Sequence, residues 1–121
     1  MKKIIFTENA PLPIGPYSQA VLVNGTLYCS GQIASTCLDG DIVAQTEAVC
    51  KNISIVLQAA NMELQDIVKT TCFLADMTHF AKFNEIYERY FSHKPARSCV
   101  AAKELPKGAL VEIEVVATYS S

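Results

Sequence analysis

The first third of the chain alternates between short apolar runs and turn-forming residues, a pattern typical of β-strands. Residues 2–7 alternate weakly, which predicts a short first strand. The apolar runs 20–23 and 26–30 flank Asn24-Gly25, and this dipeptide predicts a tight hairpin because both residues tolerate a positive φ. Three prolines within residues 11–16 predict ordered but irregular backbone between the first strand and the hairpin.

From residue 41 the spacing of the apolar positions becomes helical. Asp41 is suited to cap the start of this helix and Asn61 to stop its end. Between them a single apolar stripe is formed by Val49, Ile53, Val56, Leu57 and Ala60. We therefore expect a first helix that buries this stripe against a sheet.

A strand and a second helix follow. Residues 68–74 are rich in β-branched side chains, which predicts a central strand. Asp76 or Thr78 then provides a cap, and Pro95 closes the second helix. Its buried stripe is predicted to consist of Phe80, Phe83, Tyr87 and Phe91.

The chain finishes with two more predicted strands, 96–102 and 110–119, joined by a turn at residues 105–108. The predicted order is β, β-hairpin, α, β, α, β, β within one domain, residues 1–121. Both helices follow strands, so they can pack on one face of a single mixed sheet, which makes the fold class α+β. The last strand is apolar on both faces in places, and an open apolar face favours association of several copies.

Composition and charge narrow the function classes. Half of the residues are hydrophobic and 18% are charged, against an ordinary share of about 25%; a second copy covering part of the surface would explain the shortage. The net charge of −2 argues against a strongly basic nucleic-acid binder and offers no polybasic patch for a membrane. Apolar stretches are too short for a membrane span or a secretory signal.

The cysteines and histidines indicate neither a disulfide framework nor a metal site. Five cysteines are an odd number, no Cys-x-x-Cys pair is present, and His79 and His93 lie apart. We therefore expect a reduced, cytoplasmic protein without a bound metal.

Arg97 and Cys99 stand two residues apart in a predicted strand and so project from one face. If the two final strands pair tightly, Cys99 lies opposite Glu112 and Arg97 opposite Glu114, which would gather an arginine, a thiol and two carboxylates. The alternative for Arg97 is a strand-edge arginine paired with a nearby carboxylate, and for the two glutamates a solvated strand face. Cys99 as a nucleophile would need a base that neither histidine supplies, so a small buried side chain is the favoured interpretation.

Other polar residues stand at positions where a side chain needs a partner or a ligand can approach. Asn84 falls on the apolar stripe of the second helix and must be hydrogen-bonded there, most commonly as a loop anchor. Tyr17 follows Gly15-Pro16 in the rigid segment, and Ser30-Gly31 ends a strand, where the absence of a side chain lets a ligand approach the backbone.

A set of motifs resembles the Rid (YjgF) family of reactive-intermediate deaminases. Pro95-Ala96-Arg97-Ser98-Cys99-Val100, then Leu105-Pro106 and Val111-Glu112-Ile113-Glu114, is similar to the C-terminal signature of that family. The similarity extends upstream, in the correct order, through Ile14-Gly15-Pro16-Tyr17-Ser18-Gln19, Tyr28-Cys29-Ser30-Gly31-Gln32-Ile33, Asp66-Ile67-Val68-Lys69-Thr70-Thr71 and Phe83-Asn84 with Tyr87.

The resemblance implies a chorismate-mutase-like fold and a homotrimer with active sites between subunits. It also implies hydrolysis of enamines and imines such as 2-aminoacrylate to 2-oxo acids and ammonia, without a cofactor. Arg97 would bind the substrate carboxylate and Glu112 would orient or deprotonate the water. The pocket would be completed by Tyr17, Ser30, Gly31, Asn84 and Cys99.

Three other functions remain open on the sequence. A trimer that binds a small carboxylate and regulates a partner would use the same Arg97 pocket. A ribonuclease is disfavoured by the negative charge, because phosphate contacts dominate RNA affinity. A chaperone-like role has no specific support in the sequence.

Overall fold

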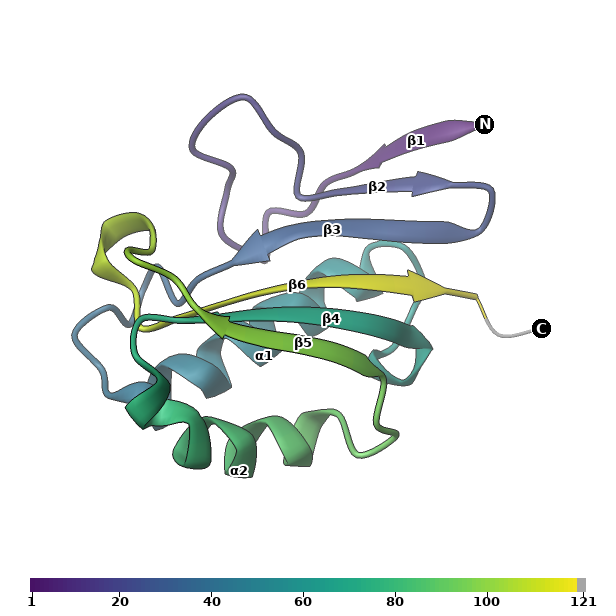
Figure 1. The fold of residues 1–121 in the computed structure, drawn as a ribbon. Helices are drawn as coiled ribbons and strands as arrows, with labels where there is room; N and C mark the ends of the chain where they lie inside the picture. Colours follow the sequence, from purple (N-terminus) through teal and green to yellow (C-terminus); the bar gives the residue numbers. More distant parts are fainter. Residues whose placement is uncertain (120–121) are drawn as a thin grey trace.

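Six strands form one mixed sheet, and both helices pack against one of its faces (Figure 1). The computed structural model describes residues 1–119. The elements are β1 (Lys2–Ile5), β2 (Ala20–Val23), β3 (Thr26–Gln32), α1 (Ile42–Gln58), β4 (Ile67–Leu74), α2 (Phe80–Tyr90), β5 (Ala96–Ala101) and β6 (Val111–Thr118). In space the strands follow the order β1-β2-β3-β6-β4-β5. The predicted α+β architecture is confirmed.

The N-terminal hairpin forms as its turn residues predict. Asn24 and Gly25 have φ values of 49° and 80°, and β2 pairs with β3 directly across them. The pairing of β3 with β6 is interrupted by a register shift between Cys29 and Gln32. Ser30 and Gly31 lie within this interruption, where a β-bulge bends the strand and breaks the regular ladder.

The helix boundaries reflect their caps. The Asp41 side chain accepts a hydrogen bond from the Ala44 backbone amide at 2.9 Å, and α1 starts at the next residue. Asp76 caps a short 3₁₀ turn, residues 77–79, that leads into α2. The expected end of α2 at Pro95 is wrong: the helix ends at Tyr90, and a turn in which Lys94 has a φ of 56° precedes the proline.

The expected pairing of the last two strands is also wrong, because β4 lies between them. β5 runs parallel to β4, with Thr70 opposite Arg97, and β6 pairs antiparallel with the other edge of β4. The unit β4-α2-β5 is a strand-helix-strand crossover, which places its two strands in parallel. The residues between β5 and β6 carry the chain across the end of β4, where Ala102 donates to the carbonyl of Leu74.

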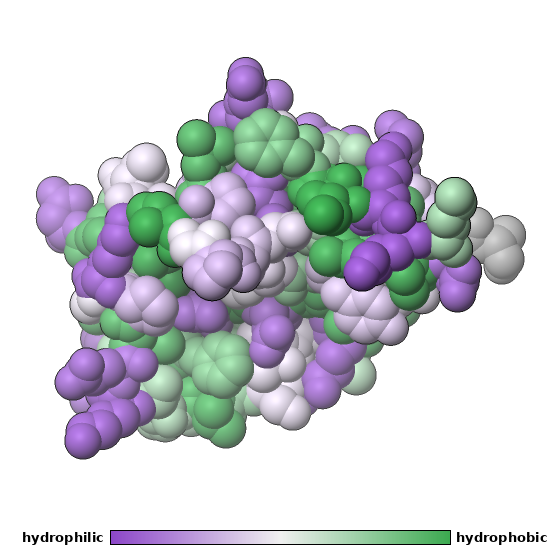
Figure 2. All heavy atoms as spheres, turned by 90° about the horizontal axis from the view of Figure 1, so that it is seen from above, coloured by the Kyte–Doolittle hydropathy of each residue, from purple (hydrophilic) through white to green (hydrophobic). Residues whose placement is uncertain are grey.

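The two faces of the sheet differ in what covers them. Alternate residues of β6 face the helices and are buried, as the period of two predicts: Val111, Ile113, Val115 and Ala117. On the other face Tyr28 and Val100 keep about half of their surface exposed (52% and 51%). Seen from above, the side of β1, β2 and the loop between them shows hydrophobic side chains scattered among hydrophilic ones (Figure 2).

Neither helix has the length and apolar character that a membrane crossing requires, within residues 1–119.

Candidate active site

Five of the residues singled out from the sequence line one cavity on the open face of the sheet. The cavity has a volume of about 410 Å³ and lies between the loop before β2, the end of β3 and the start of β6. Its walls are formed by Tyr17, Ser30, Gly31, Ile33, Pro106, Glu112 and Glu114. We call this the Glu112 half-site.

Glu112 points across the interrupted part of β3. Its carboxyl group lies over the α-carbon of Gly31, closely enough that any side chain at position 31 would collide with it. Ser30 is fixed beside it, because its hydroxyl donates to the Ser18 carbonyl at 2.6 Å and its amide donates to the Gln19 carbonyl at 3.0 Å. The register shift in β3 therefore brings together the loop before β2, to which Ser30 is bonded, and the Glu112 carboxylate.

The loop at residues 6–19 is held in place by one buried amide. The Gln19 side chain donates to the carbonyls of Thr7 and Pro11, both at 3.0 Å, and accepts from the Thr7 amide at 2.8 Å. Tyr17 closes the end of the loop: its own amide donates to the Gly15 carbonyl at 2.9 Å. The prolines predicted an ordered loop, and these hydrogen bonds are what orders it.

The surroundings of Glu112 make its carboxylate a good proton acceptor. Burial raises the pKa of the Glu112 carboxyl above its ordinary value, and the nearby Glu114 carboxylate raises this pKa further. A carboxylate with a raised pKa is a stronger base than an exposed one and works closer to neutral pH. This cavity therefore combines a basic carboxylate with a hydroxyl and the bare backbone of a glycine.

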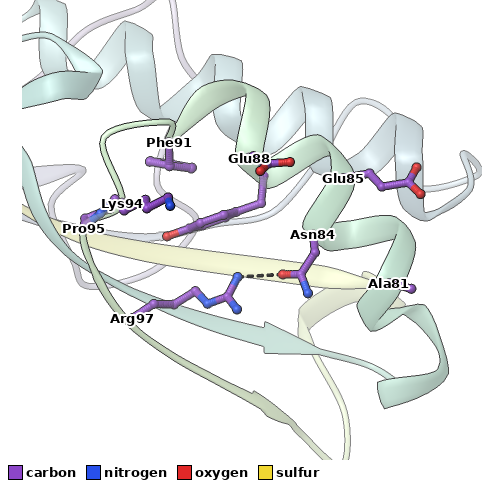
Figure 3. A pocket seen from close by; sticks show the side chains of 9 residues that line it. Ala81, Asn84, Glu85, Glu88, Phe91, Lys94, Pro95 and Arg97 are labelled. Atoms are coloured by element: carbon purple, nitrogen blue, oxygen red, sulfur yellow. Dashed lines mark hydrogen bonds between the residues drawn. The ribbon is translucent and has the colours of Figure 1, made fainter.

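Arg97 and Asn84 face each other in a second cavity, of about 430 Å³, between α2 and β5 (Figure 3). Its walls are formed by Ala81, Asn84, Glu85, Tyr87, Glu88, Phe91, Lys94, Pro95 and Arg97. The Arg97 Nη1 donates to the Asn84 Oδ1 at 2.7 Å. We call this the Arg97 half-site.

The Arg97 guanidinium is held by neutral groups. Besides the Asn84 amide it lies near three aromatic rings, among which the Tyr87 centroid is 4.8 Å from Cζ. Glu85 and Glu88 extend from α2 away from the guanidinium in Figure 3. The alternative expectation, a strand-edge arginine paired with a nearby carboxylate, is wrong: among residues 1–119 no carboxylate pairs with Arg97. Its charge is free to receive an anion.

Cys99 lies half-buried beside Arg97 on the same face of β5, paired across the ladder with Cys72. Burial raises the pKa of the Cys99 thiol above its ordinary value, and the Arg97 charge opposes this shift only in part. The thiol is therefore mainly protonated at neutral pH, which is unsuited to nucleophilic attack.

The expected gathering of Arg97, Cys99, Glu112 and Glu114 on one face is contradicted. Arg97 and Cys99 are in register with Thr70 and Cys72, both of which are buried beneath the helices. Glu112 is in register with Phe73, which lies on the opposite face. The sheet therefore separates the Glu112 half-site from the Arg97 half-site within one protomer.

Several lining residues were not identified from the sequence as parts of a site. Ile33 and Pro106 complete the wall around Glu112, although Pro106 was expected only as a turn residue. Tyr87 was expected in the core and among the motifs that resemble Rid proteins, but without a role in the site, yet its ring faces Arg97. Its spacing was a further signal, because residues three apart on a helix share a face and Tyr87 follows Asn84 by three.

Metal ligands do not cluster in the part of the chain that the structure describes: no three His, Cys, Asp or Glu side chains there are placed to share an ion.

Comparisons with known proteins place this arrangement in a family. The family model described as endoribonuclease L-PSP matches residues 7–119. A RutC family protein of Pyrococcus horikoshii is 49% identical over 97% of this chain and 98% of its own.

Two solved structures share the fold. RidA from an Antarctic Psychrobacter species superposes with a TM-score of 0.92 at 39% identity, covering 97% of this chain and 99% of the other. TdcF of Escherichia coli, solved with bound serine, gives a TM-score of 0.89 at 36% identity, covering 98% and 99%. The motifs that resemble Rid proteins, the sheet order and these matches agree, and the chain belongs to the endoribonuclease L-PSP family, also called the RutC or Rid (YjgF) family.

Proposed function

We propose that this protein hydrolyses reactive 2-enamino and 2-imino acids, such as 2-aminoacrylate and its imine, to 2-oxo acids and ammonia. The observation that carries the proposal is the Glu112 carboxyl, whose pKa is raised by burial in a cavity beside Ser30 and Gly31. Imine hydrolysis needs a base of this kind to direct one water molecule at the C=N carbon.

Arg97 would receive the carboxylate of the substrate. A guanidinium binds a carboxylate through two parallel N–H···O bonds, and the neutral partners of Arg97 leave its charge uncompensated. Membership of the family of RidA supports this assignment. The serine in TdcF supports it too, because serine carries the same carboxylate next to a nitrogen-bearing carbon.

The reaction would proceed in two proton-balanced steps. Glu112 takes a proton from water as the oxygen bonds to the imine carbon, and passes this proton to the nitrogen to give a carbinolamine. Glu112 then takes the proton of the new hydroxyl group and delivers it to the nitrogen as the C–N bond breaks, so that ammonia leaves and the 2-oxo acid remains. Tyr17, Ser30, Asn84 and the backbone near Gly31 and Cys99 would orient the substrate, and positioning supplies most of the rate.

A complete site would require two protomers. The two half-sites lie on opposite faces of the sheet, so one small molecule cannot contact Arg97 and Glu112 of the same chain. We propose a homotrimer in which the Arg97 half-site of one protomer meets the Glu112 half-site of the next. Exposed apolar side chains such as Tyr28 and Val100 would be covered by this assembly.

The test is direct. An amino-acid oxidase generates imino acids in situ, and their decay is followed with this protein, without it, and with an Arg97→Ala variant. The proposal is supported if the imino acids decay faster with the wild-type protein than without protein or with the Arg97→Ala variant. If the wild-type protein accelerates the decay of no imino acid, the proposal is overturned and the second candidate is favoured.

That second candidate is a regulatory protein that binds a small carboxylate without hydrolysing it. The free charge of Arg97 serves this function equally well, and serine bound to TdcF favours it. Binding of serine by calorimetry, together with unchanged imine decay, would support this function.

A further inference from the structure

Tyr87 separates the buried core from the Arg97 guanidinium. Only 7% of its surface is exposed, and it lies on α2, close to one turn after Asn84. Its ring centroid is 4.8 Å from the guanidinium Cζ, compared with 5.5 Å for Phe80 and 6.0 Å for Phe83. At these separations a cation is attracted to the electron-rich face of a ring. Tyr87 offers the nearest such face.

The Tyr87 ring is fixed from two sides. Its hydroxyl lies 2.7 Å from the Thr70 hydroxyl, and this hydrogen bond is buried. Thr70 is the residue directly opposite Arg97 in the β4–β5 ladder, so the bond ties the ring to the row of the sheet that carries the arginine. Phe91 stacks against the ring with 4.4 Å between centroids and an angle of 29°. The ring therefore has little freedom to tilt.

This arrangement orients a cation without neutralising it. A carboxylate would also hold Arg97 in place, but it would compete with an anionic ligand for the same N–H groups. The Asn84 amide occupies one N–H group of Arg97, and the aromatic face occupies one side of the guanidinium plane. Most of the five N–H donors therefore stay open.

We propose that Tyr87 is a positioning residue for Arg97. Its ring fixes the plane of the guanidinium, and its bond to Thr70 fixes the ring. The expected gain in substrate binding rests on the proposed function, whereas the orientation of Arg97 by Tyr87 does not.

The first experiment observes Arg97 itself. The chain has two arginines, Arg97 and the exposed Arg89, so a nitrogen–proton correlation spectrum contains two Nε–Hε signals. We expect the Arg97 signal to be displaced from that of Arg89 by the ring current of Tyr87. Tyr87→Leu should move it toward the Arg89 position, whereas Tyr87→Phe should keep most of the displacement. Tyr87→Met, whose flexible unbranched side chain adapts to an irregular space, repeats the test if the leucine variant does not fold.

Tyr119→Leu is the matched control. The Tyr119 hydroxyl also makes one short hydrogen bond, donating at 2.7 Å to the Ala60 carbonyl, but this ring does not contact Arg97. The control should leave the Arg97 signal unchanged. An Arg97 signal that is identical in wild type and in Tyr87→Leu would overturn the proposal, whether or not the protein is an enzyme.

The second experiment separates positioning from stability. In the imine assay, Tyr87→Leu should raise KM about tenfold and leave kcat within about twofold, since carboxylate binding is lost more than chemistry. Tyr87→Phe should bring KM most of the way back, because the stacking on Phe91 still holds a ring that has lost its bond to Thr70. Equal KM values in all three proteins, with only the melting temperature lowered, would mean a structural role and overturn the proposal.

Discussion

The Glu112 carboxyl group occupies the space that a side chain at Gly31 would need. A β-carbon on Gly31 would lie 2.9 Å from the Glu112 Cδ and 3.0 Å from its Cγ. The φ of Gly31 is not positive, so the backbone would accept any residue, and the need for glycine arises from the space above it.

Gly31→Ala should therefore displace the Glu112 carboxylate and slow the reaction while the fold persists. We expect kcat to fall by roughly tenfold to a hundredfold, less than the roughly 10²–10⁴-fold that loss of a general base costs, because the carboxylate is displaced and not removed. The loss should be smaller in a Glu112→Gln background, because two changes that affect one group are not additive. The cycle is measured as kcat. If the losses of the two single variants add fully in the double variant, Gly31 acts independently of Glu112.

Arg97→Ala should lower kcat/KM by roughly tenfold to a hundredfold, because a charge-assisted hydrogen bond contributes about 1.5–3 kcal/mol. Arg97→Lys should recover little, since an ammonium group lacks the planar pair of donors. Steady-state kinetics measures both variants. Arg89→Ala, which removes the other arginine of the chain, is the control and should retain full activity. Wild-type kinetics in Arg97→Ala would refute the assignment of the carboxylate site.

The pH dependence should report the raised pKa of Glu112. Activity should fall on the acid side as Glu112 becomes protonated, and at a higher pH than an ordinary glutamate would give. Glu114→Gln removes the like charge, so it should lower the pKa of Glu112 and shift this acid limb to lower pH. A pH–rate profile of kcat/KM for both proteins decides the matter, and an unmoved limb contradicts the coupling.

The same shift predicts the effect of Glu112→Gln on stability. Because the pKa is higher in the folded state, the folded protein binds the proton more tightly, and this stabilisation is lost as pH rises through the folded pKa. At neutral pH the neutral glutamine should therefore melt at a slightly higher temperature than wild type while turning over more slowly. The difference in melting temperature should vanish in acid, below the pKa of an unfolded glutamate. A variant less stable at neutral pH would contradict the raised pKa.

Cys99→Ser should retain most of the activity. Its pKa is raised and no base activates it, so we expect shape and backbone contacts from this residue, and serine preserves both. The comparison is kcat/KM beside wild type. A loss as large as that of Arg97→Ala would instead indicate covalent chemistry at the sulfur.

Mixing two inactive variants tests the division of the site between protomers. Tyr17→Ala and Arg97→Ala proteins, unfolded together in equal amounts and refolded, should regain about a quarter of wild-type activity if assembly is random. Each intact site needs an unaltered Tyr17 from one chain and an unaltered Arg97 from its neighbour, and each is present with a probability of about one half. If both residues came from the same chain, no activity would return.

Local sequence signals predicted the helices and strands, whereas the order of the strands depends on contacts between residues that are far apart in the sequence. Asn24-Gly25 and Asp41 act on their immediate neighbours, so their turn and cap could be read directly from the sequence. The pairing of β5 was misjudged because a turn between two strands usually makes a hairpin. Here the α2 crossover takes precedence: it sets β5 parallel to β4, and β6 fills the gap on the other side.

That one error explains what was misjudged about the candidate site. Most of the residues chosen from the sequence line one of two cavities, and Cys99 lines neither, but with β5 and β6 as neighbours Arg97 and Glu112 would share a face. A strand inserted between them changes which residues are in register, and that relationship has no local trace in the sequence.

Gln19 gives the loop at residues 6–19 a property that its lack of regular structure hides. Its single side chain holds the backbone of Thr7 on both its donor and its acceptor, as a neighbouring strand would, and also reaches Pro11. The Thr7 amide should therefore exchange its hydrogen with water at the slow rate of a core strand. Because Gln19 of the same chain holds Thr7 and Pro11, this part of the loop is ordered before any ligand arrives, and binding need not be preceded by its ordering.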